Sequence, residues 1–152
     1  MSEIAETVDV EVPVGLVYDQ WTQFATFPEF MAGVVDVVQH GDTRMTWEIV
    51  IGGRHRRFDA EVVEQVPDER IAWRTVDGVT HDGVVAFHRL DAERTRVTLR
   101  MRTVPEGTVD TLGDRLGLVR GRVKDDLRRF KHFIEERRTP TGAWRGEVPP
   151  RQ

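Results

Sequence analysis

Apolar and polar residues alternate near the N-terminus, where Ile4, Val8 and Val10 are separated by polar residues. A period of two places the apolar side chains on one face, so this run is predicted to be a half-buried strand. Pro13 ends the strand and suits the first turn of a helix. Apolar residues then recur at helical spacing through residues 13–24. Pro28 cannot continue the same helix, so a second short helix or turn is predicted there.

Six further strand-like runs follow, and Gly, Asp or Pro separates each from the next. Short connections of this kind imply antiparallel pairing, because parallel strands need long crossovers. The alternation of Trp47 and Ile49 with Glu48 predicts one covered face and one wet face. The predicted strands span residues 34–39, 44–51, 55–66, 70–76, 80–90 and 95–103.

The last long segment carries an apolar stripe that advances by three or four residues, which is typical of an amphipathic helix. Its arginines, among them Arg122 and Arg129, are interleaved with Asp125 and Asp126, which indicates a solvated face with salt bridges. Periodicity ends after Arg138, so residues 139–152 are predicted to form a flexible tail outside a single domain of residues 1–138. The stripe consists of Leu112, Leu116, Val119, Val123, Leu127, Phe130 and Ile134.

Composition narrows the functional classes. The 152 residues correspond to one domain, and no apolar run is long enough for a membrane span. The N-terminus lacks the features of a signal peptide, so a cytoplasmic protein is expected. A net charge of −4 argues against a nucleic-acid partner, and the lack of cysteine excludes disulfides and thiolate metal sites. No histidine pair has metal-site spacing and no nucleotide-binding motif is present, so neither a metal nor a cofactor is expected.

The order of predicted elements resembles the helix-grip fold of START-like and Bet v 1-like (SRPBCC) ligand-binding proteins. Several segments are similar to its bacterial polyketide cyclase/dehydrase branch, and their order covers about residues 1–138. The resemblance implies an α+β protein in which a curved antiparallel sheet of about seven strands surrounds a long C-terminal helix, with a hydrophobic ligand in a cavity between them. The similar segments are residues 17–21, 27–31, 60–64, 67–73, 77–78, 83–87, 95–99 and 126–131.

The apolar side chains expected on the inner face are the candidate ligand-binding residues. They suit a flat apolar ligand, but they could equally fill a core, because in this fold the residues around the cavity also contact the ligand. These candidates are Trp47, Phe58, Trp73, Phe87, Met101, Val123 and Leu127.

Arg56 and His81 are the candidate catalytic residues. Arg56 shares its strand parity with Phe58, so its guanidinium is placed to meet an anionic or enolic oxygen. The alternative is that Arg56 belongs to a solvated strand end. Histidine transfers protons near neutral pH, and His81 and His88 have opposite parities, so at most one of them faces inward.

Three functions are consistent with the sequence. The first is a polyketide cyclase/dehydrase that acts without metal or nucleotide; whether the protein is an enzyme at all is left open. The second is a carrier or chaperone for a lipid or quinone, which the apolar residues Phe58, Ala60 and Val62 favour. The third is a regulatory module that docks a protein through its arginine-rich helix or through the tail with Trp144. The expected partner is a small hydrophobic ligand, and a homodimer is left open.

Overall fold

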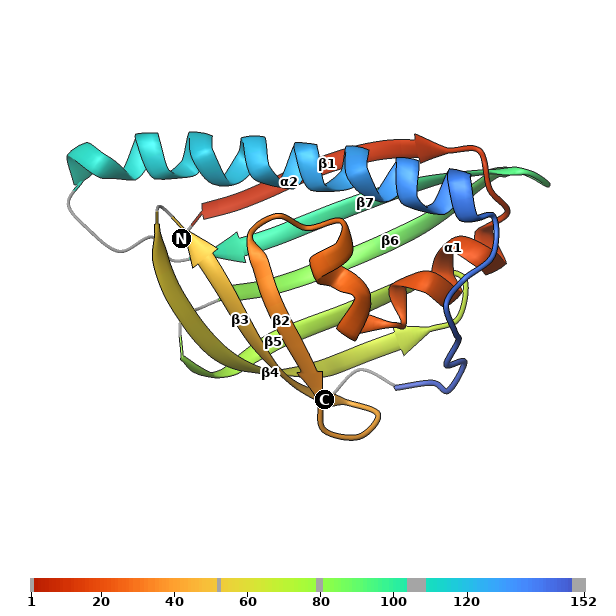
Figure 1. Ribbon diagram of the computed structural model, residues 1–152, viewed down its shortest axis with the longest axis horizontal. Coiled ribbons are helices and arrows are strands. Elements are labelled where there is room, and N and C mark those ends of the chain that lie inside the picture. The colour runs from red at the N-terminus through yellow and green to blue at the C-terminus, as the bar shows by residue number, and fades with distance from the viewer. Residues whose placement is uncertain (1, 52, 79–80, 104–108, 149–152) are drawn as a thin grey trace.

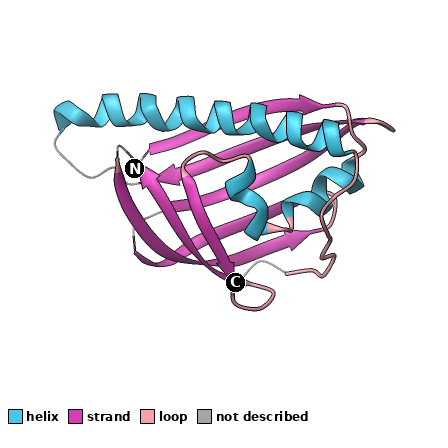
Figure 2. Ribbon diagram, in the orientation of Figure 1, coloured by secondary structure: helices cyan, strands magenta, loops and turns pink. Residues whose placement is uncertain are grey.

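The computed structural model describes residues 2–51, 53–78, 81–103 and 109–148, with side chains for residues 3–50, 53–77, 82–102 and 121–148. In these residues, seven strands form one antiparallel sheet in the order β1-β7-β6-β5-β4-β3-β2 (Figures 1 and 2). The predicted strands are present, close to their predicted bounds. Those bounds are β1 Ser2–Val10, β2 Val34–Gln39, β3 Arg44–Ile51, β4 Arg54–Val66, β5 Arg70–Gly78, β6 His81–Asp91 and β7 Arg94–Thr103.

Three helical elements lie on one side of the sheet. They are α1 (Val14–Trp21), the short 3₁₀ helix η1 (Phe24–Glu29) and the long α2 (Val109–Arg137). α1 begins after Pro13, whose carbonyl accepts bonds from the N–H groups of Leu16 and Val17. α2 runs lengthwise beside β1, η1 packs against β2, and α1 lies near one end of β6 (Figure 1). The sheet curls around this layer as predicted.

Four irregularities in strand pairing contribute to the curvature of the sheet. The register shifts at Val35 in β2, at Val63 in β4, at Val76 in β5 and at Leu90 in β6, and at each shift one residue is left without a cross-strand partner. Such bulges bend a strand and increase its twist. The bulge at Val63 also changes the parity of β4, so that Gln65 rather than Glu64 is buried.

An apolar core fills the space between the inner face and the helices. Trp21 of α1 contacts Phe27 and Phe130, with ring centroids 5.2 and 5.1 Å away. Phe30 in turn lies 5.1 Å from Phe130 of α2. This aromatic group therefore joins α1, η1 and α2 into one layer over the sheet.

Residues 139–148 lie against α1 and the end of β4. Thr141 donates its N–H to Gln20 Oε1 over 2.9 Å, and Trp144 donates its N–H to Thr22 Oγ1 over 3.1 Å. Val148 and Gln65 exchange two backbone hydrogen bonds. These contacts were not predicted from the sequence. The predicted flexibility of the tail concerns motion in solution, and it stays a prediction.

Candidate functional site

Three aromatic rings are stacked on the inner face of the sheet. Trp47 of β3 lies between Phe58 of β4 and Trp73 of β5, with ring centroids 5.6 and 6.2 Å apart and interplanar angles of 17° for both pairs. All three side chains are buried. We call Phe58, Trp47 and Trp73 the aromatic stack; it forms a flat apolar surface across three adjacent strands.

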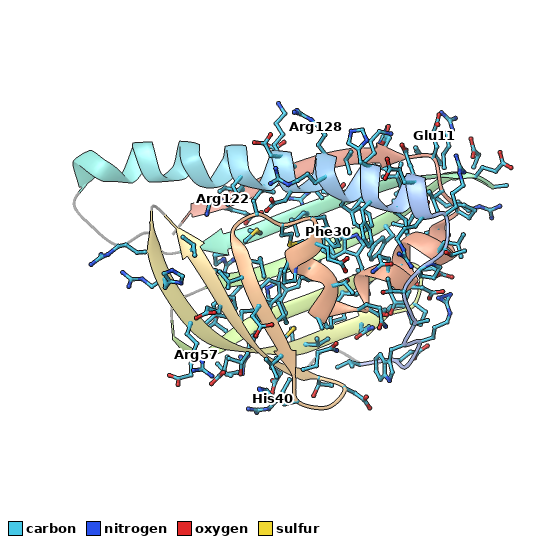
Figure 3. All side chains as sticks on the ribbon, viewed as in Figure 1. Glu11, Phe30, His40, Arg57, Arg122 and Arg128 are labelled. Carbon is cyan, nitrogen blue, oxygen red and sulfur yellow. The ribbon has the colours of Figure 1, made fainter. Side chains whose placement is uncertain are left out.

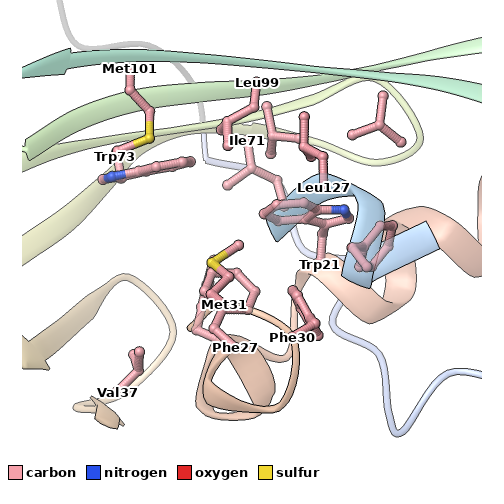
Figure 4. Close-up of a cluster of buried hydrophobic side chains, with 14 of the residues drawn as sticks. Trp21, Phe27, Phe30, Met31, Val37, Ile71, Trp73, Leu99, Met101 and Leu127 are labelled. Carbon is pink, nitrogen blue, oxygen red and sulfur yellow. The ribbon is translucent and has the colours of Figure 1, made fainter. Parts of the chain in front are cut away.

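A glycine leaves room for the outermost ring of the stack. Gly83 of β6 is paired with Trp73 and, on its other side, with Met101 of β7. A Cβ atom on Gly83 would lie only 2.3 Å from Cζ2 of Trp73, far inside van der Waals contact. The indole therefore lies flat over the backbone of β6 because residue 83 has no side chain, and Met101 lies beside it (Figure 4).

The seven predicted ligand-binding side chains are all buried, with exposures from 1% to 8%. They do not form one group around the stack. Phe87 lies at the α1 end of the sheet, where its ring meets that of Tyr18 edge to face at 5.4 Å. Val123 and Leu127 belong to the apolar stripe of α2. Their burial agrees with the sequence pattern, while their contact with a ligand stays a prediction.

The two predicted catalytic residues lie on β4 and β6, which are separated in the sheet by β5. Arg56 of β4 is paired with buried Ile49, two residues before Phe58, and its side chain is partly exposed. This position agrees with an inward parity at the margin of the stack. His81 begins β6 opposite Thr103, and its side chain lies outside the described residues. His88 of the same strand is exposed, which excludes it as an inward-facing group.

The prediction of a solvated position is wrong for one charged residue of α2. Asp126, expected on a solvated face, is only 8% exposed because the η1–β2 loop crosses it. Its Oδ1 accepts hydrogen bonds from the N–H of Ala32 (3.1 Å) and from the guanidinium of Arg129 (2.5 Å). Burial raises the pKa of Asp126, and the bonds from Arg129 and Ala32 offset part of that effect.

Two arginines complete this arrangement. Arg129 also donates from Nε to the carbonyl of Phe30 over 3.1 Å, and Arg122 donates to the carbonyl of Val50 at the end of β3. We call Arg122, Asp126 and Arg129 the loop clamp. The sequence signal for it is weak: Asp126 directly precedes Leu127 on the flank of the apolar stripe, but the sequence does not show that a loop passes there.

A separate pocket of about 210 Å³ lies between the tail, the start of η1 and the β2–β3 turn. Its lining is largely polar and includes none of the predicted site residues. The described side chains include no group of three or more acidic or histidine residues placed to hold a metal ion. None of the described helices has the length and apolar character required to cross a bilayer. The pocket is lined by Thr22, Gln23, Phe24, Gln39, Gly41, Asp42, Gln65, Ala143 and Trp144.

Comparison with known proteins agrees with this architecture. Residues 10–131 match the family described as polyketide cyclase/dehydrase and lipid transport. An uncharacterized 17.2 kDa protein of Streptomyces lincolnensis is 51% identical over 149 residues, which cover 97% of this chain and 99% of that protein.

Two solved structures show the shared fold. The Zhui aromatase/cyclase of Streptomyces sp. R1128 has a TM-score of 0.73 at 19% identity, with 94% of this chain and 99% of that chain covered. A START superfamily protein of Mycobacterium smegmatis has a TM-score of 0.66 at 13% identity, with 89% and 95% covered. The predicted helix-grip fold is thereby confirmed.

Proposed function

Because the chain belongs to the polyketide cyclase/dehydrase and lipid transport family, we propose that it binds a small hydrophobic, polyketide-like or aromatic ligand between the inner face of the sheet and α2. The aromatic stack carries this proposal. Three nearly parallel rings on adjacent strands offer apolar ring faces, and offset stacking against such rings contributes more than apolar burial alone. A planar ligand fits this surface better than a branched one.

The proposed reaction is a cyclisation and dehydration of the bound ligand. An aldol-type step needs a donor that polarises a carbonyl and a group that moves a proton. The guanidinium of Arg56, next to the stack on β4, supplies fixed donors for a developing oxyanion. His81 supplies the proton-transfer group in this scheme. The structural likeness to the Zhui aromatase/cyclase supports the assignment at the level of fold.

A carrier function is the second candidate, and the composition of β4 favours it. Phe58, Ala60 and Val62 are successive inward residues of this strand, and all three are buried and apolar. A wall of this kind can bind a lipid or quinone without acting on it. The family description names lipid transport together with cyclases, so membership in the family is compatible with either function.

Native mass spectrometry of the protein from its producing organism tests ligand binding directly. We expect a mass above that of the chain, and denaturing extraction should release the bound molecule. A polyketide or aromatic compound supports the cyclase, and a lipid or quinone supports the carrier. If the protein carries nothing and binds no apolar dye, the proposal of an internal ligand site is wrong.

Substitutions separate the two candidates once a ligand is known. Arg56→Ala and His81→Ala should abolish turnover while ligand affinity stays within a few fold, if the protein is a cyclase. Arg57→Ala is the matched control, because Arg57 is the next residue on β4 and is exposed, away from the inner face (Figure 3). Binding without turnover in the wild type and in every variant supports the carrier.

The cytoplasmic location and the lack of a nucleic-acid partner stay predictions, and the oligomeric state stays open. Docking of a protein through Trp144 is the least favoured function, because the N–H of Trp144 is bonded to Thr22 and its side chain is partly buried. Removal of residues 139–152 tests it: capture of a protein partner by the full chain and not by the shortened one supports docking.

A further inference from the structure

The loop between η1 and β2 closes the core on its inner side with apolar contacts. Phe30 and Met31 are both buried. The ring of Phe30 lies 5.1 Å from that of Phe130 and 5.3 Å from that of Phe133, both on α2. Met31 extends into the buried cluster from the side opposite Trp73 (Figure 4). Residues 30–33 therefore lie between the surface and the buried side chains that cover the inner face of the sheet.

The outer side of the same loop is held by polar contacts instead. The carbonyl of Phe30 and the N–H of Ala32 are bonded to Arg129 and Asp126, which are side chains of α2 and not strand partners. Water can replace both bonds when the loop moves away, so their net contribution to a closed loop is smaller than their strength in isolation. The ion pair between Asp126 and Arg129 is partly exposed on its arginine side, and such pairs contribute little to stability. We call these polar contacts between residues 30–33 and α2 the seam. The loop should separate from α2 more readily at this seam than it would at an apolar contact.

Arg122 links this seam to the sheet. Its side chain lies across Gly33, where a Cβ atom would be 2.7 Å from Cδ of Arg122, and its guanidinium donates to the carbonyl of Val50. The N–H of Val50 in turn donates to the carbonyl of Gly33 over 2.8 Å. Arg122 lies on the sheet side of α2, whereas Arg128 points away from the sheet (Figure 3).

We propose that residues 30–33 form the gate through which a ligand reaches the aromatic stack, and that the loop clamp holds this gate shut. The inference rests on the proposed internal site. Displacement of the loop withdraws Phe30 and Met31 from the core. Asp126 and Arg129 then exchange their bonds to the loop for bonds to water, and Gly33 moves away from the side chain of Arg122. The flexible thioether side chain of Met31 suits a group that leaves and re-enters a packed interior.

A reversible disulfide across the seam tests the gate. Cδ of Arg122 is two bonds from its own Cβ, so the Cβ atoms of residues 33 and 122 lie at most about 5 Å apart, close to the 3.5–4.5 Å that a disulfide needs. The chain has no cysteine, so the Gly33→Cys, Arg122→Cys variant contains a single possible bridge. Its oxidised and reduced forms share one sequence and control for each other.

The probe is N-phenyl-1-naphthylamine, a neutral apolar dye, followed by stopped-flow fluorescence. Oxidation should slow association and dissociation of the dye by about tenfold or more. The Kd of the dye should change little, because the loop is closed both in the free protein and in the complex, so the disulfide slows both rates equally. In the uncrosslinked chain, Arg122→Ala should accelerate both rates. Arg128→Ala should change neither, because Arg128 is exposed and contacts Asp125 on the outer face of the same helix. Equal rates in the oxidised and reduced forms would overturn the gate and leave the proposed ligand site intact.

Hydrogen exchange tests the gate even if no dye binds, an outcome that would count against the ligand site. The amide of Ala32 should exchange at least tenfold faster than central amides of β6 and β7, because a gate opens without global unfolding. Oxidation of the cysteine pair should remove most of this difference. If the Ala32 amide exchanges as slowly as the central strands in the wild type, the loop does not open alone and the gate is wrong.

Discussion

Gly83 is the residue whose replacement should disturb the aromatic stack most directly. A methyl group there would overlap Trp73, whose ring is fixed between Trp47 and the backbone of β6. Overpacking of a buried site typically costs about 1–3 kcal/mol, and we expect Gly83→Ala to lower the free energy of unfolding by that amount. Urea denaturation measures it, and the shape of the dye-binding surface should change as well.

Gly121→Ala is the matched control for this substitution. Gly121 is exposed on α2, and a Cβ atom there meets no other atom within 4 Å. Alanine in a helix interior is favoured over glycine by roughly 0.5–1 kcal/mol, so this variant should be slightly more stable than the wild type. A loss of stability in both variants would show that alanine at Gly83 does not act through Trp73.

The free energy of unfolding should depend on pH through Glu135. Its Oε2 accepts hydrogen bonds from Lys131 (2.7 Å) and from the N–H of Glu11 (2.8 Å). Burial raises the pKa of Glu135, but the bonds from Lys131 and Glu11 outweigh it, and the pKa lies below its usual value of 4.5. The unfolded chain therefore binds this proton more readily. The stability contributed by Glu135 is present above about pH 4.5 and is lost as the pH falls through the lower, folded-state pKa.

Glu135→Gln should reduce this dependence. We expect a loss of up to about 1 kcal/mol at pH 7, and less difference from the wild type once the pH falls below the folded-state pKa, because the wild-type carboxylate is then protonated too. Urea denaturation at a series of pH values measures the effect. Glu136→Gln, on the exposed side of α2, is the control. A constant difference between Glu135→Gln and the wild type at every pH would contradict the assignment.

At the residue scale, alternation in the sequence was sufficient to predict the burial of Trp47, Trp73 and Met101. It was not sufficient for Asp126. The polarity of a helical residue indicates a solvated position only where no other segment crosses it, and the path of the η1–β2 loop depends on contacts across the whole chain. The aromatic stack could not be predicted either, because the relative positions of rings on β3, β4 and β5 depend on strand register and not on composition.

Among the elements, the segment 139–148 has the clearest testable role. The guanidinium of Arg145 pairs with Asp19 and Asp68, at 2.7 Å each, and lies over the ring of Tyr18. Thr141 is bonded to Gln20, a fully buried amide. Deletion of residues 139–152 should remove these partners and lower the free energy of unfolding by more than about 2 kcal/mol, since each buried polar group left unpaired costs about 1–3 kcal/mol.

Deletion of residues 149–152 alone is the control, because it leaves the contacts of Thr141, Arg145 and Val148 in place. Thermal unfolding of the two shortened chains, compared with the full chain, measures the difference. Similar midpoints for all three would show that the tail contributes little to the fold and would favour the flexible tail that the sequence predicts.

The bounds of the strands were predictable because residues typical of turns separate the strands in the sequence, and because consecutive strands have short connections. The helix α2 was predictable from its apolar stripe, although it extends beyond the stripe to Val109–Arg137. The bulges at Val35, Val63 and Val76 were not, since a bulge is decided by the partner strand as much as by its own residues. The packing of residues 139–148 could not be predicted for a similar reason, because it depends on contacts with residues of α1 and β4.

For the whole molecule, stability and space for a ligand compete in one interior. Trp47, Trp73 and Phe58 are at most 4% exposed, so the described side chains around the stack are close-packed. A ligand over the stack must therefore displace side chains or find room where flexible ones withdraw. Met101, beside Trp73 and 8% exposed, is one such side chain.

Met101→Ala should remove a packed side chain and leave a cavity that a ligand can fill. Truncation of a buried methionine typically costs about 2–5 kcal/mol, and an apolar cavity of this kind stays dry and accepts small apolar molecules. We expect lower stability in urea together with a severalfold higher affinity for N-phenyl-1-naphthylamine, and the bound dye should restore part of the lost stability. Val97→Ala is the control, because Val97 is fully buried on the same strand β7 but is paired with Val8 and Phe87, away from the stack. If both variants lose stability and neither gains affinity, the ligand does not lie over Trp73. A gain confined to Met101→Ala would locate the binding surface at the aromatic stack, since a cavity elsewhere in the same core would have failed to create a site.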